Sequence, residues 1–143
     1  MSGPPDDAAL RDLVLAYATA VDTGDRRTFR CLFAEDAVLA ISAVADPERI
    51  VSERRGDALE EVIDRIARFE RTDHRVGRAT FAVADDGTAT GRVGTTADHW
   101  AGGADGPSVW TLHIEYADRY VRTSDGWRFA RRTVRVLGES RTP

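Results

Sequence analysis

The sequence contains no lysine, no asparagine and no glutamine, so all 20 of its basic residues are arginines. Without lysine the chain cannot form a Schiff base and has no phosphate-binding loop of the Walker type. Without side-chain amides it cannot build an oxyanion hole from asparagine or glutamine. Any chemistry must therefore come from carboxylates, arginine, hydroxyl groups, one cysteine and three histidines, which are His74, His99 and His113.

Composition and charge exclude further classes of protein. The chain has 143 residues, of which 42% are hydrophobic and 31% charged, as in a soluble globular domain. We expect one domain over residues 6–138, between flexible ends at residues 1–5 and 139–143. The arginines are spread along the chain and the net charge is −4, so we expect no nucleic-acid partner and no membrane partner. The first residues have neither the basic nor the apolar region of a signal peptide, and we therefore expect a cytoplasmic protein.

Cysteine and histidine do not form a recognisable metal motif. The sequence has no HExxH pattern and no clustered Cys/His spacing, so we expect neither a metal nor another cofactor. The single cysteine, Cys31, cannot form an internal disulfide. Its apolar neighbours on a helix predict a buried structural thiol.

Three segments show the apolar spacing of an amphipathic helix. The first covers residues 6–23 and is ended by Gly24, which can adopt a left-handed conformation. A short second helix follows, with Asp25 as its N-cap. The third begins with Asp57 as N-cap and has Glu60 three residues later, which is a capping-box pattern. The predicted buried faces consist of large apolar side chains: Leu10, Leu13, Val14, Tyr17 and Val21 in the first helix, Phe29, Leu32 and Phe33 in the second, and Leu59, Val62, Ile63, Ile66 and Phe69 in the third.

The remaining sequence predicts strands. Residues 37–44 and 49–52 favour a short hairpin. From Thr72 onward, alternation with a period of two is interrupted by three glycine-containing turns, which predicts four long antiparallel strands. Helices followed by consecutive strands indicate an α+β domain, and glycines within the strands allow the sheet to curl. A curled sheet covered by helices would enclose a pocket, which suggests a ligand.

Several motifs together resemble the SnoaL-like branch of the nuclear transport factor 2-like superfamily. The resemblance covers nearly the whole chain and rests on residues 11–14, Tyr17, residues 20–22 and 24–25, Phe29, and residues 32–37, 72–77, 116–120 and 125–129. It implies a cone-shaped, curved antiparallel sheet of four long strands and a short hairpin, covered by three helices around an apolar pocket. Members include scytalone dehydratase, a lindane dehydrochlorinase, ketosteroid isomerase and polyketide cyclases, and also binding modules without catalytic activity. The fold alone therefore does not imply a reaction.

The resemblance implies a catalytic pair. In the dehydratase and dehydrochlorinase members an Asp on the first helix orients a His on the first long strand, and that His acts as the base. Asp22 and His74 stand at the matching positions. A carboxylate that accepts a hydrogen bond from one imidazole nitrogen stabilises the imidazolium that forms when the other nitrogen takes a proton. Alternatively, Asp22 only caps the end of the helix, and His74 is an ordinary hydrogen-bonded histidine of the core or its rim.

Five further residues are candidates for substrate binding: Tyr17, His99, Trp100, Tyr116 and Arg132. His99 is similar to a second histidine of scytalone dehydratase and would either donate a hydrogen bond to a substrate oxygen or only pack. Tyr17 stands where the dehydrochlorinase has a cationic side chain, which argues against dehalogenation. Arg132 matches an arginine at the mouth of that site, although a bulge would exchange its face with that of Arg131. The aromatic rings would favour an apolar ligand, or they belong to the core.

These observations lead to two hypotheses. The first is a cofactor-independent enzyme that uses the His–Asp pair to remove a proton from an apolar, polyketide- or steroid-like substrate, as a dehydratase, isomerase or cyclase. The alternative is a ligand-binding or accessory module that uses the same pocket without chemistry. The resemblance also implies a homodimer that pairs through the outer face of the sheet, where Thr111, His113 and Glu115 are expected. His113 would then point away from the pocket.

Overall fold

The structure of the protein is a computed structural model that describes residues 4–143. Part of the predicted flexible N-terminus, residues 1–3, lies outside the described residues, and the first helix already begins at Pro4. In chain order the elements are α1 (Pro4–Thr23), α2 (Arg26–Cys31), β1 (Phe33–Ala43), β2 (Asp46–Arg55), η1 (Gly56–Glu60), α3 (Glu61–Ile66), β3 (Arg71–Val83), β4 (Thr88–Ala101), β5 (Ser108–Thr123) and β6 (Gly126–Thr142).

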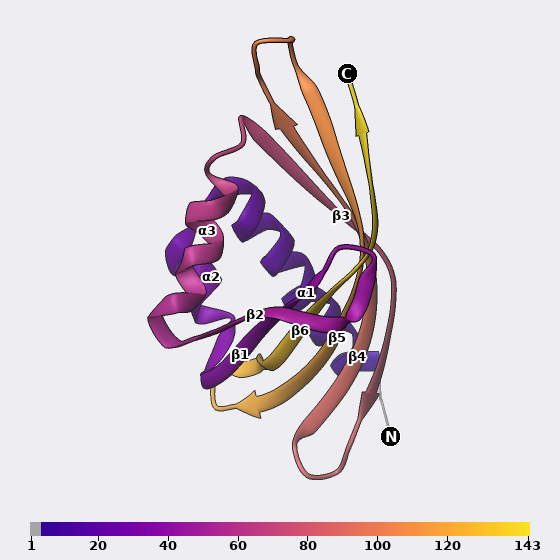
Figure 1. The fold of residues 1–143 in the computed structure, drawn as a ribbon. Helices are drawn as coiled ribbons and strands as arrows, with labels where there is room; N and C mark the ends of the chain where they lie inside the picture. The colour runs from indigo at the N-terminus through magenta and orange to yellow at the C-terminus, as the bar shows by residue number, and fades with distance from the viewer. Residues whose placement is uncertain (1–3) are drawn as a thin grey trace.

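The strands form one sheet in the order β2-β1-β6-β5-β4-β3. The β1–β6 pair is parallel and the other neighbouring pairs are antiparallel. Figure 1 shows that the sheet curves around the helices, which lie on one of its faces, while the β4–β5 hairpin and the end of β6 extend beyond them. The predicted α+β fold, with four long strands, a hairpin and three helices, is confirmed.

The first corner of the chain has the predicted capping signals. Gly24 follows α1 with a φ of +67°. The Asp25 side chain accepts a hydrogen bond from the backbone N–H of Thr28 at 3.1 Å and is the N-cap of α2. The backbone N–H of Phe129 then donates to the carbonyl of Leu32 at 2.9 Å, so the chain passes directly from α2 into the sheet.

The third helix differs from the prediction. Its first turn is the 3₁₀ helix η1, Asp57 lies inside this turn, and neither η1 nor α3 has a side-chain cap. The predicted capping box at Asp57 and Glu60 is therefore wrong. The helix also ends at Ile66, because the backbone N–H of Glu70 donates to the Trp100 carbonyl at 2.9 Å and the chain has joined the sheet by that point. The apolar spacing predicted a helix as far as Phe69, but the pairing of the following residues with β4 ends the helix at Ile66.

Two other expectations are corrected. Cys31 is exposed rather than buried, since it is the last residue of the six-residue helix α2 and lies on the side away from Phe29. The C-terminal residues expected to form a flexible tail from residue 139 belong to β6, where Glu139 lies opposite Leu112 and Thr142 lies opposite Val109.

The core lies between α1 and the concave face of the sheet. Five of its rings meet with centroid distances from 5.2 to 6.3 Å, and they belong to Tyr17, Phe29, Phe33, Tyr116 and Phe129. Aromatic rings at such distances stabilise a core beyond their burial alone. In the part of the chain that the structure describes, no helix is long and apolar enough to cross a membrane.

Gly91 of β4 offers a test of how tightly this face is packed. A Cβ atom there would lie 2.6 Å from the Tyr120 hydroxyl and 2.9 Å from Phe81. We expect Gly91→Ala to lower the free energy of unfolding by about 1–3 kcal/mol, because the buried Tyr120 would have to move. Gly138→Ala is the matched control, since a Cβ at that position meets no atom within 4 Å. Urea denaturation of both variants measures the difference, and equal stability of the two would contradict the prediction.

Candidate active site

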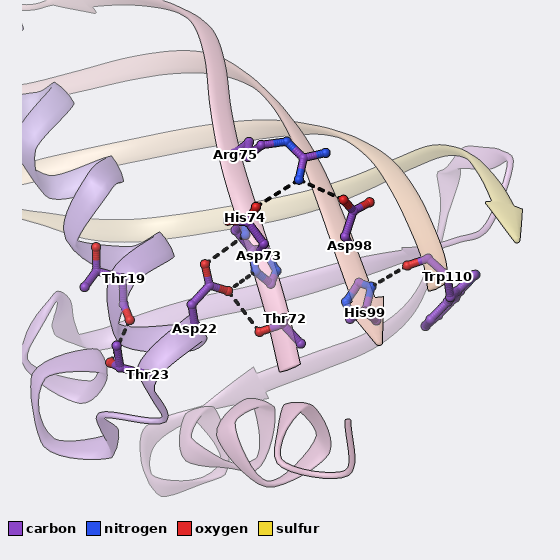
Figure 2. A network of polar contacts seen from close by, with 10 residues as sticks. All are labelled: Thr19, Asp22, Thr23, Thr72, Asp73, His74, Arg75, Asp98, His99 and Trp110. Carbon is purple, nitrogen blue, oxygen red and sulfur yellow. Dashed lines mark hydrogen bonds and ion pairs between the residues drawn. The ribbon is translucent and has the colours of Figure 1, made fainter. Parts of the chain in front are cut away.

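Asp22, in the last turn of α1, is held against the start of β3 (Figure 2). Its Oδ1 contacts Nδ1 of His74 at 2.6 Å and accepts a hydrogen bond from the Thr72 hydroxyl at 2.9 Å. Its Oδ2 accepts a hydrogen bond from the backbone N–H of His74 at 2.8 Å. Three contacts therefore fix the carboxylate toward the sheet, and the capping of α2 is left to Asp25.

These contacts define the protonation of the pair. Burial raises the pKa of the Asp22 carboxyl, but the hydrogen bonds from His74 and Thr72 outweigh it and hold this pKa below its usual value. The carboxylate is therefore ionised and accepts the proton on Nδ1 of His74. Nε2 of His74 then carries a lone pair and has no hydrogen-bond partner among residues 4–143. The His74 side chain is only 7% exposed, so this imidazole is largely shielded from solvent.

His99 places a second imidazole beside the first. The two rings are 5.8 Å apart and nearly perpendicular, and His99 also packs against Phe69 at 4.8 Å and Trp110 at 5.1 Å. Burial lowers the pKa of His99, so the ring is neutral at neutral pH. Its Nδ1 donates to the Trp110 carbonyl at 3.0 Å, which leaves Nε2 as an acceptor. Nε2 of a neutral His99 is therefore a hydrogen-bond acceptor, whereas the sequence suggested either a donor to a substrate oxygen or a packing residue.

Tyr17 of α1 and Tyr116 of β5 meet in the core of the protein. Their rings are 5.7 Å apart, and both side chains are almost fully buried. Burial raises the pKa of both hydroxyls, so both groups stay neutral and can donate hydrogen bonds. The rise at Tyr116 comes mainly from its burial, and the nearby Tyr17 ring adds to it.

Arg132 was expected at the mouth of the site but is wholly buried in the core. Its Nε and Nη2 donate to the two carboxylate oxygens of Asp118 at 2.9 and 3.0 Å, and the Tyr120 hydroxyl donates to the same carboxylate at 2.7 Å. A register shift of the β5–β6 pair next to Tyr120 points Arg132 inward, while Arg131 faces outward and pairs with Glu53. The burial of Arg132 would lower its pKa, but the charge of Asp118 outweighs this effect and raises it.

Asp118 is a residue that sequence reasoning missed. It lies between Tyr116 and Tyr120 with the same parity, so all three side chains point to the helix-covered face. A carboxylate at such a position needs a buried cation, and this signal could have identified the pair with Arg132.

Trp100 lies apart from the other candidates. It follows His99 directly in β4 and therefore projects from the opposite face of the sheet, where the Arg71 guanidinium lies 4.5 Å from its ring. Trp110 is the tryptophan beside His99. The structure thus joins Asp22, His74 and His99 in one cluster. Tyr17, Tyr116 and Arg132 form a second, buried cluster in the core.

A hollow of about 180 Å³ opens beside Asp22, between the end of α1, α3 and the start of β3. Its lining is mixed, with Ile63 and Phe69 beside Asp22, Glu70 and Arg71, and neither His74 nor His99 is among its lining residues. Among the described residues no cluster of three or more His, Cys, Asp or Glu side chains could hold a metal ion.

Residues 5–133 match the family described as the SnoaL-like domain. The chain belongs to this family. No curated protein matches this SnoaL-like chain in sequence.

Solved structures show the same fold over nearly the whole SnoaL-like chain. A protein assigned as an aromatic ring hydroxylase from Novosphingobium aromaticivorans is 26% identical, with a TM-score of 0.81 over 99% of this chain and 96% of that one. A protein assigned as a scytalone dehydratase from the same species is 21% identical, with a TM-score of 0.76 over 93% and 85%. The hexachlorocyclohexane dehydrochlorinase LinA-type3 from Novosphingobium barchaimii is 14% identical, with a TM-score of 0.78 over 95% and 89%.

The lowered pKa of His99 predicts a pH dependence of stability. The unfolded chain protonates this ring near the ordinary pKa of 6.5, whereas the folded chain does so only at lower pH. The unfolded state therefore binds more protons as the pH falls below 6.5, and the contribution of His99 to stability is full above that pH and declines below it. In urea denaturation, the free energy of unfolding of wild type should fall when the pH is lowered from about 7.5 to about 5. We expect a smaller fall in His99→Phe, which keeps an aromatic ring but cannot take up a proton.

His113→Phe is the control for this measurement, because His113 is exposed on the other face of the sheet. It should keep the wild-type dependence on pH. The same dependence in wild type and His99→Phe would show that His99 is not the group responsible.

Proposed function

We propose that this SnoaL-like protein is a cofactor-independent enzyme in which His74, oriented by Asp22, removes a proton from a carbon atom of an apolar substrate. The contact that carries the proposal is the 2.6 Å approach of Nδ1 of His74 to the Asp22 carboxylate. This contact leaves the lone pair of Nε2 for a substrate proton and compensates the charge that the ring then acquires. Dehydration, isomerisation and ring closure all begin with this step.

The neighbouring groups suit the rest of such a reaction. When Nε2 of His74 takes a proton from carbon, the electron pair moves onto an adjacent carbonyl oxygen as an enolate. The neutral hydroxyls of Tyr17 and Tyr116 can donate hydrogen bonds to that oxygen. The imidazolium can then return its proton to another carbon in an isomerisation, or to a departing hydroxyl group in a dehydration. Nε2 of His99 can accept a hydrogen bond from that hydroxyl beforehand.

The names of the relatives support an elimination or a related proton transfer. One solved neighbour is assigned as a scytalone dehydratase and another is a hexachlorocyclohexane dehydrochlorinase. Tyr17 can donate only a hydrogen bond to a leaving group, and the charge of Arg132 is engaged by Asp118. These features favour loss of water or a proton shift over expulsion of a halide. The aromatic walls favour an apolar substrate of the polyketide or steroid type.

The test of the proposed function is proton abstraction from carbon. We expect wild-type protein in D₂O to accelerate deuterium uptake at the α-carbon of at least one member of a panel of cyclic and aromatic β-hydroxy ketones, as followed by mass spectrometry. His74→Ala should reduce the rate by about 10² or more, because a positioned general base is lost. Asp22→Asn should cause a similar loss while preserving the shape of the side chain.

Two controls distinguish catalysis from simple ligand binding. His113→Ala removes a histidine from the exposed face and should leave the rate unchanged. Nitrogen NMR should find the proton of neutral His74 on Nδ1 in wild type and partly on Nε2 in Asp22→Asn, because an amide can donate to Nδ1. Full exchange rates in both His74→Ala and Asp22→Asn would favour a binding module that uses this site without chemistry.

We further propose that the protein pairs with itself through the outer face of the sheet. This face has a groove of about 670 Å³, whose lining includes Arg92, Arg119 and Arg131 together with threonines. The outward side chain of Glu115 provides the opposite charge on the same face, so two copies can present complementary charges to each other.

Sedimentation equilibrium at micromolar concentration should therefore give twice the chain mass of 15.7 kDa. Arg119→Glu should weaken the pairing, since Arg119 has no ion pair within the described part of the chain. A mass of 15.7 kDa for wild type would contradict the dimer.

A further inference from the structure

The groove of about 670 Å³ on the outer face of the sheet lies away from the candidate active site. Three arginines line it, Arg92 of β4, Arg119 of β5 and Arg131 of β6. Small side chains such as Ala117 and Thr133 form the rest of this lining on the same face, and these two residues lie opposite each other in the β5–β6 pair. The long guanidinium side chains therefore stand around a floor of small residues.

Two of these arginines, Arg119 and Arg131, are directly opposite each other in the β5–β6 pair. Side chains at opposite positions of neighbouring strands lie close together, and like charges there destabilise a sheet. Arg131 is compensated by Glu53 at 3.3 Å, whereas Arg119 is exposed and has no ion pair within residues 4–143. One guanidinium of the groove is thus left without a counter-charge.

The carboxylates around the groove do not supply this counter-charge. Asp118 is the acidic residue of the lining, but its carboxylate is buried and bound by Arg132. Glu115 binds Arg92 at 2.8 Å and is shared with Arg135 at 3.2 Å. The groove therefore has an excess of positive charge, although the chain as a whole has a net charge of −4.

We propose that this groove is an anion-binding site that takes a phosphate group. Guanidinium groups bind phosphate oxygens through paired N–H donors, and an anion between Arg119 and Arg131 would relieve their mutual repulsion. The hydroxyls of Thr90 and Thr133 add further donors to the lining. A phosphate presents more oxygens to such a set of donors than a carboxylate does.

The size of the groove indicates what carries the phosphate. Its volume of about 670 Å³ exceeds that of a bare phosphate ion and lies within the usual range for sites that hold small organic molecules. A soluble phosphate ester therefore fits, with its phosphate at the arginines. The site is separate from the His–Asp pair, so this inference goes beyond the proposed catalysis.

Inorganic phosphate is the probe that tests the site. ¹⁵N-labelled wild-type protein is titrated with phosphate at constant ionic strength and mildly alkaline pH, and affinity is read from the amide signals. We expect saturable shifts at Ala117 and Thr133, and none when chloride replaces phosphate. Arg119→Gln should bind phosphate about tenfold or more weakly, because a charged hydrogen-bond donor is lost.

Arg27→Gln is the matched control, since it removes an exposed arginine from α2 and changes the net charge by the same amount. It should keep the wild-type affinity for phosphate. If Arg119→Gln fails to fold, Arg92→Gln removes a second guanidinium of the groove and should show the same weakening. The absence of saturable shifts in wild type, or equal affinities in the groove variant and Arg27→Gln, would overturn the proposal.

A phosphate group can also belong to a lipid, and a second measurement separates this source from a soluble phosphate. The arginines stand in a hollow, which a flat bilayer surface does not enter. We therefore expect no cosedimentation of wild type with phosphatidylglycerol vesicles. Cosedimentation that is lost in Arg119→Gln would overturn the assignment to a soluble phosphate.

A consequence of the site concerns self-association, and it rests on the proposed pairing through this face. A bound phosphate would occupy arginines that a carboxylate of the second copy would otherwise contact. In sedimentation equilibrium, wild type should associate more weakly in phosphate than in chloride at equal ionic strength, and Arg119→Gln should show no such difference. A dimer of equal strength in both salts would contradict this shared use of the groove.

The two proposals fail independently. Wild type that is monomeric in both salts would contradict the pairing alone, because the NMR titration measures phosphate binding without it. Wild type that pairs but shows no saturable phosphate shift would contradict the anion site alone.

Discussion

The contact on which the interior of this protein depends is the fully buried pair of Arg132 and Asp118 between β5 and β6. Removing either partner would leave an uncompensated charge in the core, which typically costs about 3–5 kcal/mol. The pair can exist only if the two strands keep the register that places Asp118 opposite Arg132. It also holds the rings of Tyr17 and Tyr116 against one guanidinium, so the packing of α1 on the sheet depends on it.

The His–Asp pair joins the same two layers at the other end of the site. Asp22 comes from the end of α1, and its partners Thr72 and His74 come from the first residues of β3. One helix therefore carries both Tyr17, which packs on Arg132, and Asp22, which orients the imidazole. A movement of α1 would therefore displace the Tyr17 ring from Arg132 and the Asp22 carboxylate from His74 at the same time.

Burial determines the charge state of some of these side chains but not of Asp22. Burial holds His99 and the two tyrosines in their neutral forms, because charged forms are costly where water is excluded. Asp22 remains ionised because hydrogen bonds from His74 and Thr72 overcome that cost. The result is a protein interior with neutral aromatic and imidazole side chains and an ionised carboxylate at Asp22.

The sequence by itself determined the order of the elements and the face on which most side chains lie, because helical and strand periodicity are local properties. The apolar spacing of α1, the Asp25 cap and the glycine-containing turns were sufficient for the α+β fold. Motif resemblance was sufficient to pair Asp22 with His74, whose side chains are in contact. Only the tertiary structure decided that Arg132 is buried against Asp118 and that the third helix ends early. It also decided that Trp100 lies on the opposite face of the sheet from His99. These features depend on a strand bulge, on pairing between distant strands and on desolvation, and none of these is encoded within a short window of sequence.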